Sequence, residues 1–215
     1  MKQQYFLQRC FMFIVGIFVM TLGIALSCKA GLGTSPISSV PWVVSMFTHW
    51  SIGELTIIIN VLFIIMQPIL LRKIYWRDLL GQMVTLVAFG NCIDFSMDLL
   101  SWVAPVTLLW KWFYCIFSTI ILAFGIFLCV RAKIFLAAGE GIVLVIAFVS
   151  KIKFSNVKNY FDITLVAISL VISFMEFSEM RGVGLGTIAS AVLTGRWLQL
   201  YSSKLHIFDK WTIQN

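Results

Sequence analysis

A run of small and polar residues behind the first apolar segment is the sharpest local motif that could bind a ligand. Its glycines permit positive φ angles or close backbone approach. Its threonine or serine can cap a following helix, and its proline suits the first helical turn. Such a helix start would direct free N–H groups and the positive end of the dipole at an anion, with a plain capping loop as the alternative. The expected substrate-binding residues of this motif are Lys29, Gly31, Gly33, Thr34 and Ser35.

Charged residues inside apolar segments form the second group of candidates, because a charge in lipid is costly unless it is paired or hydrated. Glu140 is expected to bind substrate or to carry a proton or cation, with a structural pair to a basic residue as the alternative. Asp94 and Asp98 are four residues apart and could share a cation or a proton. They would otherwise be hydrated interfacial acids. Arg196 is expected either to face the pocket or to reach the lipid headgroups.

Catalytic and metal-binding patterns are missing from the sequence. It contains no nucleophile motif, no phosphate-binding loop and no cluster of metal ligands. The five cysteines are scattered without a CxxC spacing, which is typical of small packing residues. We therefore expect neither enzymatic activity nor a cofactor or metal.

The composition is that of an integral membrane protein. Of the 215 residues 60% are hydrophobic and 12% are charged, against about 25% charged in a soluble domain. The net charge of +7 is explained by basic residues that flank membrane spans and meet anionic lipid. We therefore expect membrane lipids as partners and no nucleic acid.

Hydropathy predicts an all-α, polytopic transmembrane bundle. Six apolar stretches are expected to span the bilayer, over residues 11–28, 55–71, 79–101, 112–130, 163–177 and 183–201. The pattern Ser51-Ile52-Gly53-Glu54 predicts a capping box before the second span. Two shorter segments, 36–50 and 134–150, are interrupted by proline, glycine or glutamate and are typical of re-entrant or broken elements.

The distribution of Lys and Arg favours six crossings with both termini in the cytoplasm. This arrangement places thirteen of the sixteen basic residues at or near the inner side and leaves Lys29, Lys111 and Arg181 outside. If both short segments crossed the membrane instead, this bias would nearly vanish. Eight shorter or tilted spans with parallel repeats remain the alternative.

A weak internal duplication links the two halves of the chain. The pattern G-I-x-L-x-x-(K/R)-A begins at Gly23 and recurs 102 positions later at Gly125. A second pair of anchors is separated by 105 positions, with Gly81 and Gly90 in the first half and Gly186 and Gly195 in the second. We interpret the chain as one membrane domain, 1–215, built from inverted repeats of three spans and one short segment, approximately 1–105 and 106–215. The four later glycines are interpreted as helix-packing positions.

The residues just described also resemble a known family. The first span ending in Leu22-Gly23-Ile24-Ala25-Leu26, the motif 29–36, and the later Leu80-Gly81, Gly90 and Asp94 look like the YczE/YyaS/YitT group of bacterial membrane proteins. This resemblance implies a multi-pass protein of the bacterial plasma membrane. It implies no defined biochemical role, and Ala137-Ala138-Gly139-Glu140 departs from the first-half loop.

These observations lead to three functional hypotheses. The first is a transporter of a small, anionic solute that works by rocking of the repeats around a site near 31–36 and 137–141. The second is a substrate-binding membrane subunit of a larger transporter. The third is a non-transporting membrane partner of an enzyme or secretion system. Self-association or a partner subunit remains open.

Overall fold

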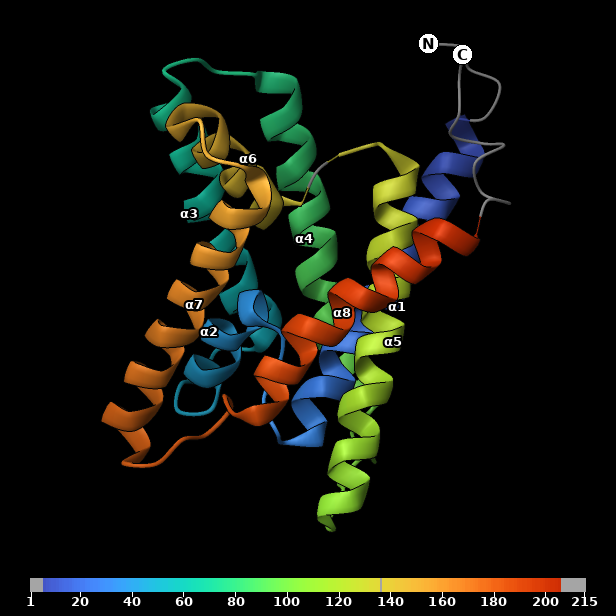
Figure 1. Ribbon diagram of the computed structural model, residues 1–215, viewed down its shortest axis with the longest axis vertical. Coiled ribbons are helices and arrows are strands. Elements are labelled where there is room, and N and C mark those ends of the chain that lie inside the picture. The colour runs from blue at the N-terminus through green and yellow to red at the C-terminus, as the bar shows by residue number, and fades with distance from the viewer. Residues whose placement is uncertain (1–5, 136, 206–215) are drawn as a thin grey trace.

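The computed structural model describes residues 6–135 and 137–205, which form a bundle of helices without strands in the described part of the chain (Figure 1). The basic residues Lys2 and Lys210 lie outside the described residues. The helices are α1 (Phe6–Ala30), α2 (Pro36–Ser45), α3 (Ile52–Leu71), α4 (Trp76–Leu99), α5 (Leu108–Ala132), α6 (Ala138–Ser150), α7 (Phe154–Phe177) and α8 (Leu185–Lys204).

The six long helices include all six expected spans, and five of them have the length and apolar composition needed to cross a membrane. These five are α1, α3, α4, α5 and α7, counted among the described residues. The sixth expected span, α8, is not among these five, and it carries Arg196, Gln199 and several hydroxyl residues. The protein is therefore an all-α, multi-pass membrane protein whose last long helix is more polar than the rest.

The start of α3 confirms the predicted capping box. The Ser51 hydroxyl accepts a hydrogen bond from the Glu54 N–H at 3.0 Å, and the Glu54 carboxylate accepts one from the Ser51 N–H at 2.8 Å. These bonds satisfy donors that have no partner inside the helix. Pro68 lies in the last turn of α3, and Arg72 ends the helix in the left-handed conformation with φ 52°.

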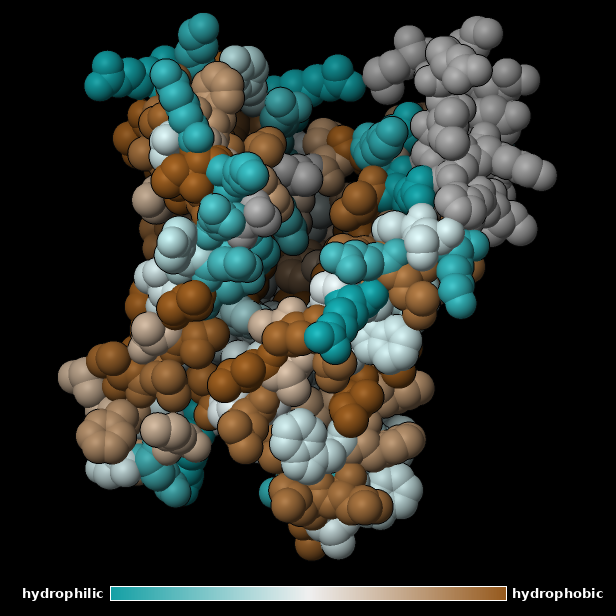
Figure 2. Space-filling view, in the orientation of Figure 1, coloured by the Kyte–Doolittle hydropathy of each residue, from teal (hydrophilic) through white to brown (hydrophobic). Residues whose placement is uncertain are grey.

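The start of α1 and the ends of α5 and α8 lie at one end of the molecule. The Arg9 side chain donates hydrogen bonds to the carbonyl oxygens of Ala132 and Lys133 at 2.8 and 2.7 Å. Arg131 donates one to the Ser202 carbonyl at 3.2 Å. The turn between α3 and α4 lies at the same end, where hydrophilic side chains gather (Figures 1 and 2). We call this the basic end, because it carries Arg9, Arg72, Lys73, Arg77, Arg131, Lys133, Lys151, Lys153 and Lys204.

Each short helix enters and leaves the bundle at one end. Along α6, Ala138 packs near Ile64 in the middle of α3, whereas the later Gly141 and Val145 line a pocket together with the end of α3. Helix α6 therefore begins in the middle of the bundle and ends toward the basic end. At 13 residues, or about 20 Å, α6 reaches only part of the way across a bilayer.

Helix α2 makes the equivalent excursion from the opposite end. Its early Ser39 bonds to Ser169 in the middle of α7, and Phe47, just beyond its end, stacks edge-on against Phe177 at the end of α7. Its 10 residues extend about 15 Å. Neither short helix runs from one end of the bundle to the other, and the number of crossings stays a prediction.

Two glycines that are 102 positions apart, Gly23 and Gly125, both lie at the crossing of α1 and α5. A Cβ added at Gly23 would lie 2.6 Å from the Leu122 nitrogen, and one added at Gly125 would press on the Met20 backbone. Met20 and Leu122 are themselves 102 positions apart, so the crossing of α1 and α5 uses equivalent residues in both directions. Side chains at these positions would separate the two backbones. The duplication itself stays a prediction.

The helix contacts of the described residues can be grouped into two bundles, and the contact between them, α3–α4, is as extensive as most of the contacts within them. The long-helix bundle consists of α1, α4, α5 and α8, joined by the pairs α1–α5, α1–α4 and α5–α8. The short-helix bundle consists of α2, α3, α6 and α7, joined by α2–α3, α2–α7, α3–α6 and α6–α7. Each bundle therefore takes two helices from each half of the sequence, and α3–α4 is the main contact between them.

Candidate functional site

The first turns of the two short helices meet in the middle of the molecule. A Cβ added at Gly139, in the first turn of α6, would lie 3.2 Å from Cδ1 of Ile37, in the first turn of α2. These two residues are also 102 positions apart. The N-cap side chains of Ser35 and Ala137 form no capping hydrogen bond. The first turns of both helices, with their unpaired N–H groups and positive dipole ends, therefore lie close together, which favours a negative charge near them.

The predicted glycine motif forms the loop that leads into α2, and it docks on the start of α8. The Leu32 carbonyl accepts a hydrogen bond from the Gly186 N–H at 2.9 Å. Gly31 and Gly33 have φ angles of 71° and 109°, which an L side chain rarely adopts. A side chain at Gly33 would also collide with Thr187. The glycine requirement is thus explained by backbone conformation and by helix packing.

The polar side chains of this motif have internal neighbours. Thr34 is fully buried, and its carbonyl accepts a hydrogen bond from the Ser190 hydroxyl at 3.4 Å. The Ser35 hydroxyl donates to Ser38 at 3.1 Å. Lys29 is half-buried in the last turn of α1. Binding of substrate by these residues therefore remains a prediction, and their observed contacts hold the loop in place.

Glu140 lies in the first turn of α6 and belongs to a charged group that the sequence alone did not bring together. Lys158 of α7 donates a hydrogen bond to Asp162, one turn later, at 2.6 Å. Both side chains keep about a quarter of their exposure, and Glu140 interacts electrostatically with both. Lys158 therefore interacts with carboxylates from two different helices, by a hydrogen bond to Asp162 and electrostatically with Glu140.

The sequence suggested a basic partner for Glu140, and the structure brings Lys158 within electrostatic reach of it. One signal in the sequence could have found this group. Lys158 and Asp162 have the i, i+4 spacing of a helical ion pair. The antiparallel run of α6 and α7 then brings Glu140 to the same level.

Asp94 and Asp98 do not form the shared site that their spacing suggested. The Asp94 carboxylate accepts hydrogen bonds from the Ser51 hydroxyl at 2.6 Å and from the Gly53 N–H at 2.8 Å, so it holds α4 against the start of α3. Asp98 is exposed. Asp94 therefore acts as an additional cap for α3, and the two carboxylates have separate environments.

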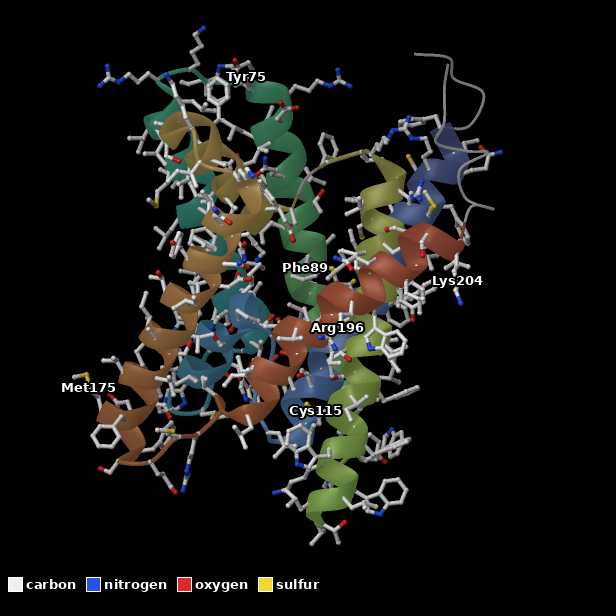
Figure 3. The ribbon with its side chains drawn as sticks, viewed as in Figure 1. Tyr75, Phe89, Cys115, Met175, Arg196 and Lys204 are labelled. Atoms are coloured by element: carbon white, nitrogen blue, oxygen red, sulfur yellow. The ribbon has the colours of Figure 1, made fainter. Side chains whose placement is uncertain are left out.

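Arg196 also lies away from the predicted site. It is exposed on the second half of α8, between the labelled Cys115 region and Lys204 at the basic end (Figure 3). Its neighbour Gly195 has no other atom of the described chain within 4 Å of an added Cβ, so the expected packing role is not used here.

The other three glycines of the repeated pairs are packing positions, as predicted. A Cβ at Gly81 would collide with the Phe135 ring, one at Gly90 would lie 2.5 Å from Ile57, and one at Gly186 would lie 2.6 Å from the Leu32 carbonyl.

All five cysteines carry free thiols.

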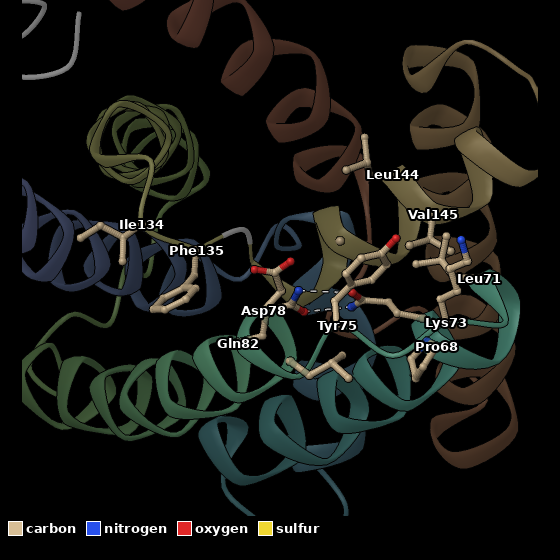
Figure 4. A pocket seen from close by; sticks show the side chains of 13 residues that line it. Pro68, Leu71, Lys73, Tyr75, Asp78, Gln82, Ile134, Phe135, Leu144 and Val145 are labelled. Carbon is tan, nitrogen blue, oxygen red and sulfur yellow. Dashed lines mark hydrogen bonds between the residues drawn. The ribbon is translucent and has the colours of Figure 1, made fainter. Parts of the chain in front are cut away.

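A pocket of about 340 Å³ opens near the basic end, between α3, α4 and α6 (Figure 4). Gln67 and Gln82 lie in its wall and join α3 to α4 through reciprocal amide hydrogen bonds of 2.9 and 3.2 Å. Lys73, Tyr75 and Asp78 supply further polar groups, and Phe135 contributes an apolar side. The sequence analysis did not predict this pocket.

The fold and these groups define a class: a polytopic helical membrane protein with two short helices that meet inside the bundle. Residues 7–203 match the family described as "Family of unknown function (DUF6198)", and the chain belongs to this family. It is 25% identical over 191 residues to "Uncharacterized protein YyaS" of Bacillus subtilis, covering 87% of this chain and 89% of that one. It is 24% identical over 200 residues to "Uncharacterized membrane protein YczE" of the same organism, covering 91% and 85%. No solved structure matches the chain.

These findings confirm the resemblance to YyaS and YczE that the glycine motif indicated. They also establish the coarse description of the chain as a multi-pass membrane protein whose helices contact lipid.

Proposed function

We propose that this protein is a carrier of a small anionic solute, with its binding site where α2 and α6 begin. The single observation that carries this proposal is the contact between Gly139 and Ile37, which brings two helix N-termini to one point inside a membrane bundle. Converging N–H groups and dipole ends favour a carboxylate or phosphate. Transporters built from internal repeats commonly bind substrate between short or broken helices near the midplane.

We propose that Glu140 couples the carrier to protons, with Lys158 as its counter-charge. Asp162 already forms a hydrogen bond with Lys158, so the second carboxylate shares one cation with it. An ionisable side chain inside a membrane bundle is a candidate for proton transfer, with its charged neighbour as partner. The expected cytoplasmic location of the basic end, and of both chain termini, follows from the positive-inside rule and belongs to this proposal.

Ligand binding is tested first with purified protein in detergent. Thermal stability is measured against a panel of small carboxylates and phosphates, each paired with its neutral amide or alcohol. A ligand at 100 times its Kd should add about 2.7 kcal/mol to stability. Gly139→Leu fills the meeting point of α2 and α6 and should remove this shift, while Val130→Phe, an exposed position on α5, should retain it. Stabilisation by the neutral members alone contradicts an anion site.

Proton coupling is tested in proteoliposomes with a solute that the panel identifies. Uptake should rise with an inwardly directed proton gradient, and Glu140→Gln should abolish this pH dependence. Glu176→Gln, an exposed acid at the far end of α7, is the matched control and should behave like the unaltered protein. Persistent pH dependence in Glu140→Gln assigns the proton to another group.

A further inference from the structure

We propose that the moving parts of this protein are the long-helix and short-helix bundles rather than its two sequence repeats, and that the α3–α4 contact alternates with an equivalent α7–α8 contact. This replaces the expectation that the repeats rock against each other. The repeats cannot separate as units, because α1 packs against α5 along their crossing, α2 packs on α7, and α6 packs on α3. The inference rests on the proposed carrier function only where it assigns this movement to solute transport.

The contacts of the described residues are nearly symmetric between the halves, with one main exception. Exchanging α1 with α5, α2 with α6, α3 with α7 and α4 with α8 converts α1–α4 into α5–α8, α2–α3 into α6–α7, and α3–α6 into α2–α7. The extensive α3–α4 contact has no comparable α7–α8 counterpart. Because the contacts of the two halves otherwise match, we infer a second arrangement in which the halves exchange roles and α7 packs on α8 in place of α3 on α4.

The repeated glycines report the same asymmetry at the level of single residues. Gly90 of α4 packs tightly on α3, since an added Cβ would lie 2.9 Å from the Gly53 carbonyl and 2.5 Å from Ile57. Its equivalent on α8, Gly195, faces open space. Ile188 and Val192 lie on the same helical face as Gly195 and are 63% and 50% exposed. This face of α8 has the composition of a packing surface, and α7 of the same chain is the occupant that the symmetry assigns to it.

The connections between the helices decide which end each arrangement would open. Helices α7 and α8 are joined at the end opposite the basic end and diverge toward the basic end, whereas α3 and α4 are joined at the basic end itself (Figure 1). Figure 2 shows the surface hollowed between the two bundles near the basic end. Closing α7 on α8 and parting α3 from α4 would therefore close this end and open the other.

The proposed binding site lies entirely within the short-helix bundle and would move with it. Gly139, Ile37, Glu140, Lys158 and Asp162 all lie in the short-helix bundle. A shift of this bundle against the long-helix bundle would present the same meeting point and the same charged group to the two sides in turn. No rearrangement within the site is required.

The exchange is tested without any solute, by pulsed electron–electron distance measurements on spin labels in lipid nanodiscs. The five native cysteines are replaced, and labels are placed at exposed positions, Asn159 with Leu200 across α7–α8 and Leu62 with Val84 across α3–α4. We expect two distances for each pair. The shorter α7–α8 distance should occur together with the longer α3–α4 distance, and a single distance for both pairs would overturn the proposal.

Substitutions at two equivalent glycines should shift the balance between the two arrangements in opposite directions. Gly195→Phe fits the open space of the described arrangement and blocks the other, so it should remove the short α7–α8 distance and leave the protein folded. Gly90→Ala disturbs the α3–α4 contact and should increase the short α7–α8 population. If Gly195→Phe leaves both distances unchanged, or instead separates a dimer into monomers as measured by mass photometry, the α8 face has a different occupant and the inference fails.

The outcomes also separate this inference from the proposed function. If the two distances are coupled but the protein neither binds nor transports any member of the anion panel, the anion carrier is refuted and the exchange of contacts is retained. If the protein takes up an anion and Gly195→Phe leaves this uptake intact, the exchange of contacts is refuted and the anion carrier is retained.

Discussion

Replacement of Asp94 by alanine should lower the free energy of unfolding by about 3 kcal/mol. The carboxylate accepts two hydrogen bonds, from the Ser51 hydroxyl and the Gly53 N–H at 2.6 and 2.8 Å. A hydrogen bond to a charged group contributes about 1.5–3 kcal/mol. We take the lower part of the summed range, because Asp94 is only partly buried and water can replace some of what is lost. Asp94→Asn keeps an acceptor and should lose about half as much.

Asp98→Ala is the matched control, because it removes an exposed carboxylate one turn away on the same helix. It should change stability by no more than about 0.5 kcal/mol. The assay is reversible unfolding in mixed micelles of a mild detergent and dodecyl sulfate, followed by tryptophan fluorescence. Equal losses for the two variants, or equal effects on a transport or binding activity with stability preserved, would refute the capping role and restore the shared acidic site.

Two further predictions concern packing around the pocket near the basic end. Gln67→Leu or Gln82→Leu alone should cost about 1–3 kcal/mol by leaving a buried amide without its partner, whereas the double variant should cost less than either; additive losses in the same unfolding assay would contradict the reciprocal pair. Gly81→Leu should reduce the yield of folded protein because of its collision with Phe135, and Phe135→Ala should restore it, as measured by size-exclusion chromatography; no rescue would place the damage elsewhere.

The membrane class and the helix boundaries could be predicted from the sequence because local properties determine them. Apolar length fixes which segments can enter lipid, and the capping box at Ser51 specifies the start of α3 through bonds between neighbouring residues. The short segments 36–50 and 134–150 were recognisable because proline, glycine and glutamate interrupt them. The position of basic residues then favoured the arrangement in which these segments return to the end that they left.

Glycines at a common spacing in the sequence also predicted that the two halves are equivalent. Small residues leave such a trace because backbones can approach closely only where side chains are small. The glycine pattern indicates where a helix can pack closely, but it does not indicate which helix packs there. Gly90 and Gly195 look alike in the sequence, yet one is packed and the other faces open space.

Tertiary structure alone decided which side chains meet. Asp94 and Asp98 share a helix face, but only Asp94 reaches the start of α3. Glu140 and Lys158 lie on different helices, and their proximity depends on the antiparallel pairing of α6 with α7. Spacing along one helix fixes relative direction within that helix, while contact across helices depends on packing that many distant residues determine together. The same reason explains why the division into two bundles, each drawn from both halves, could not be derived from the order of the segments.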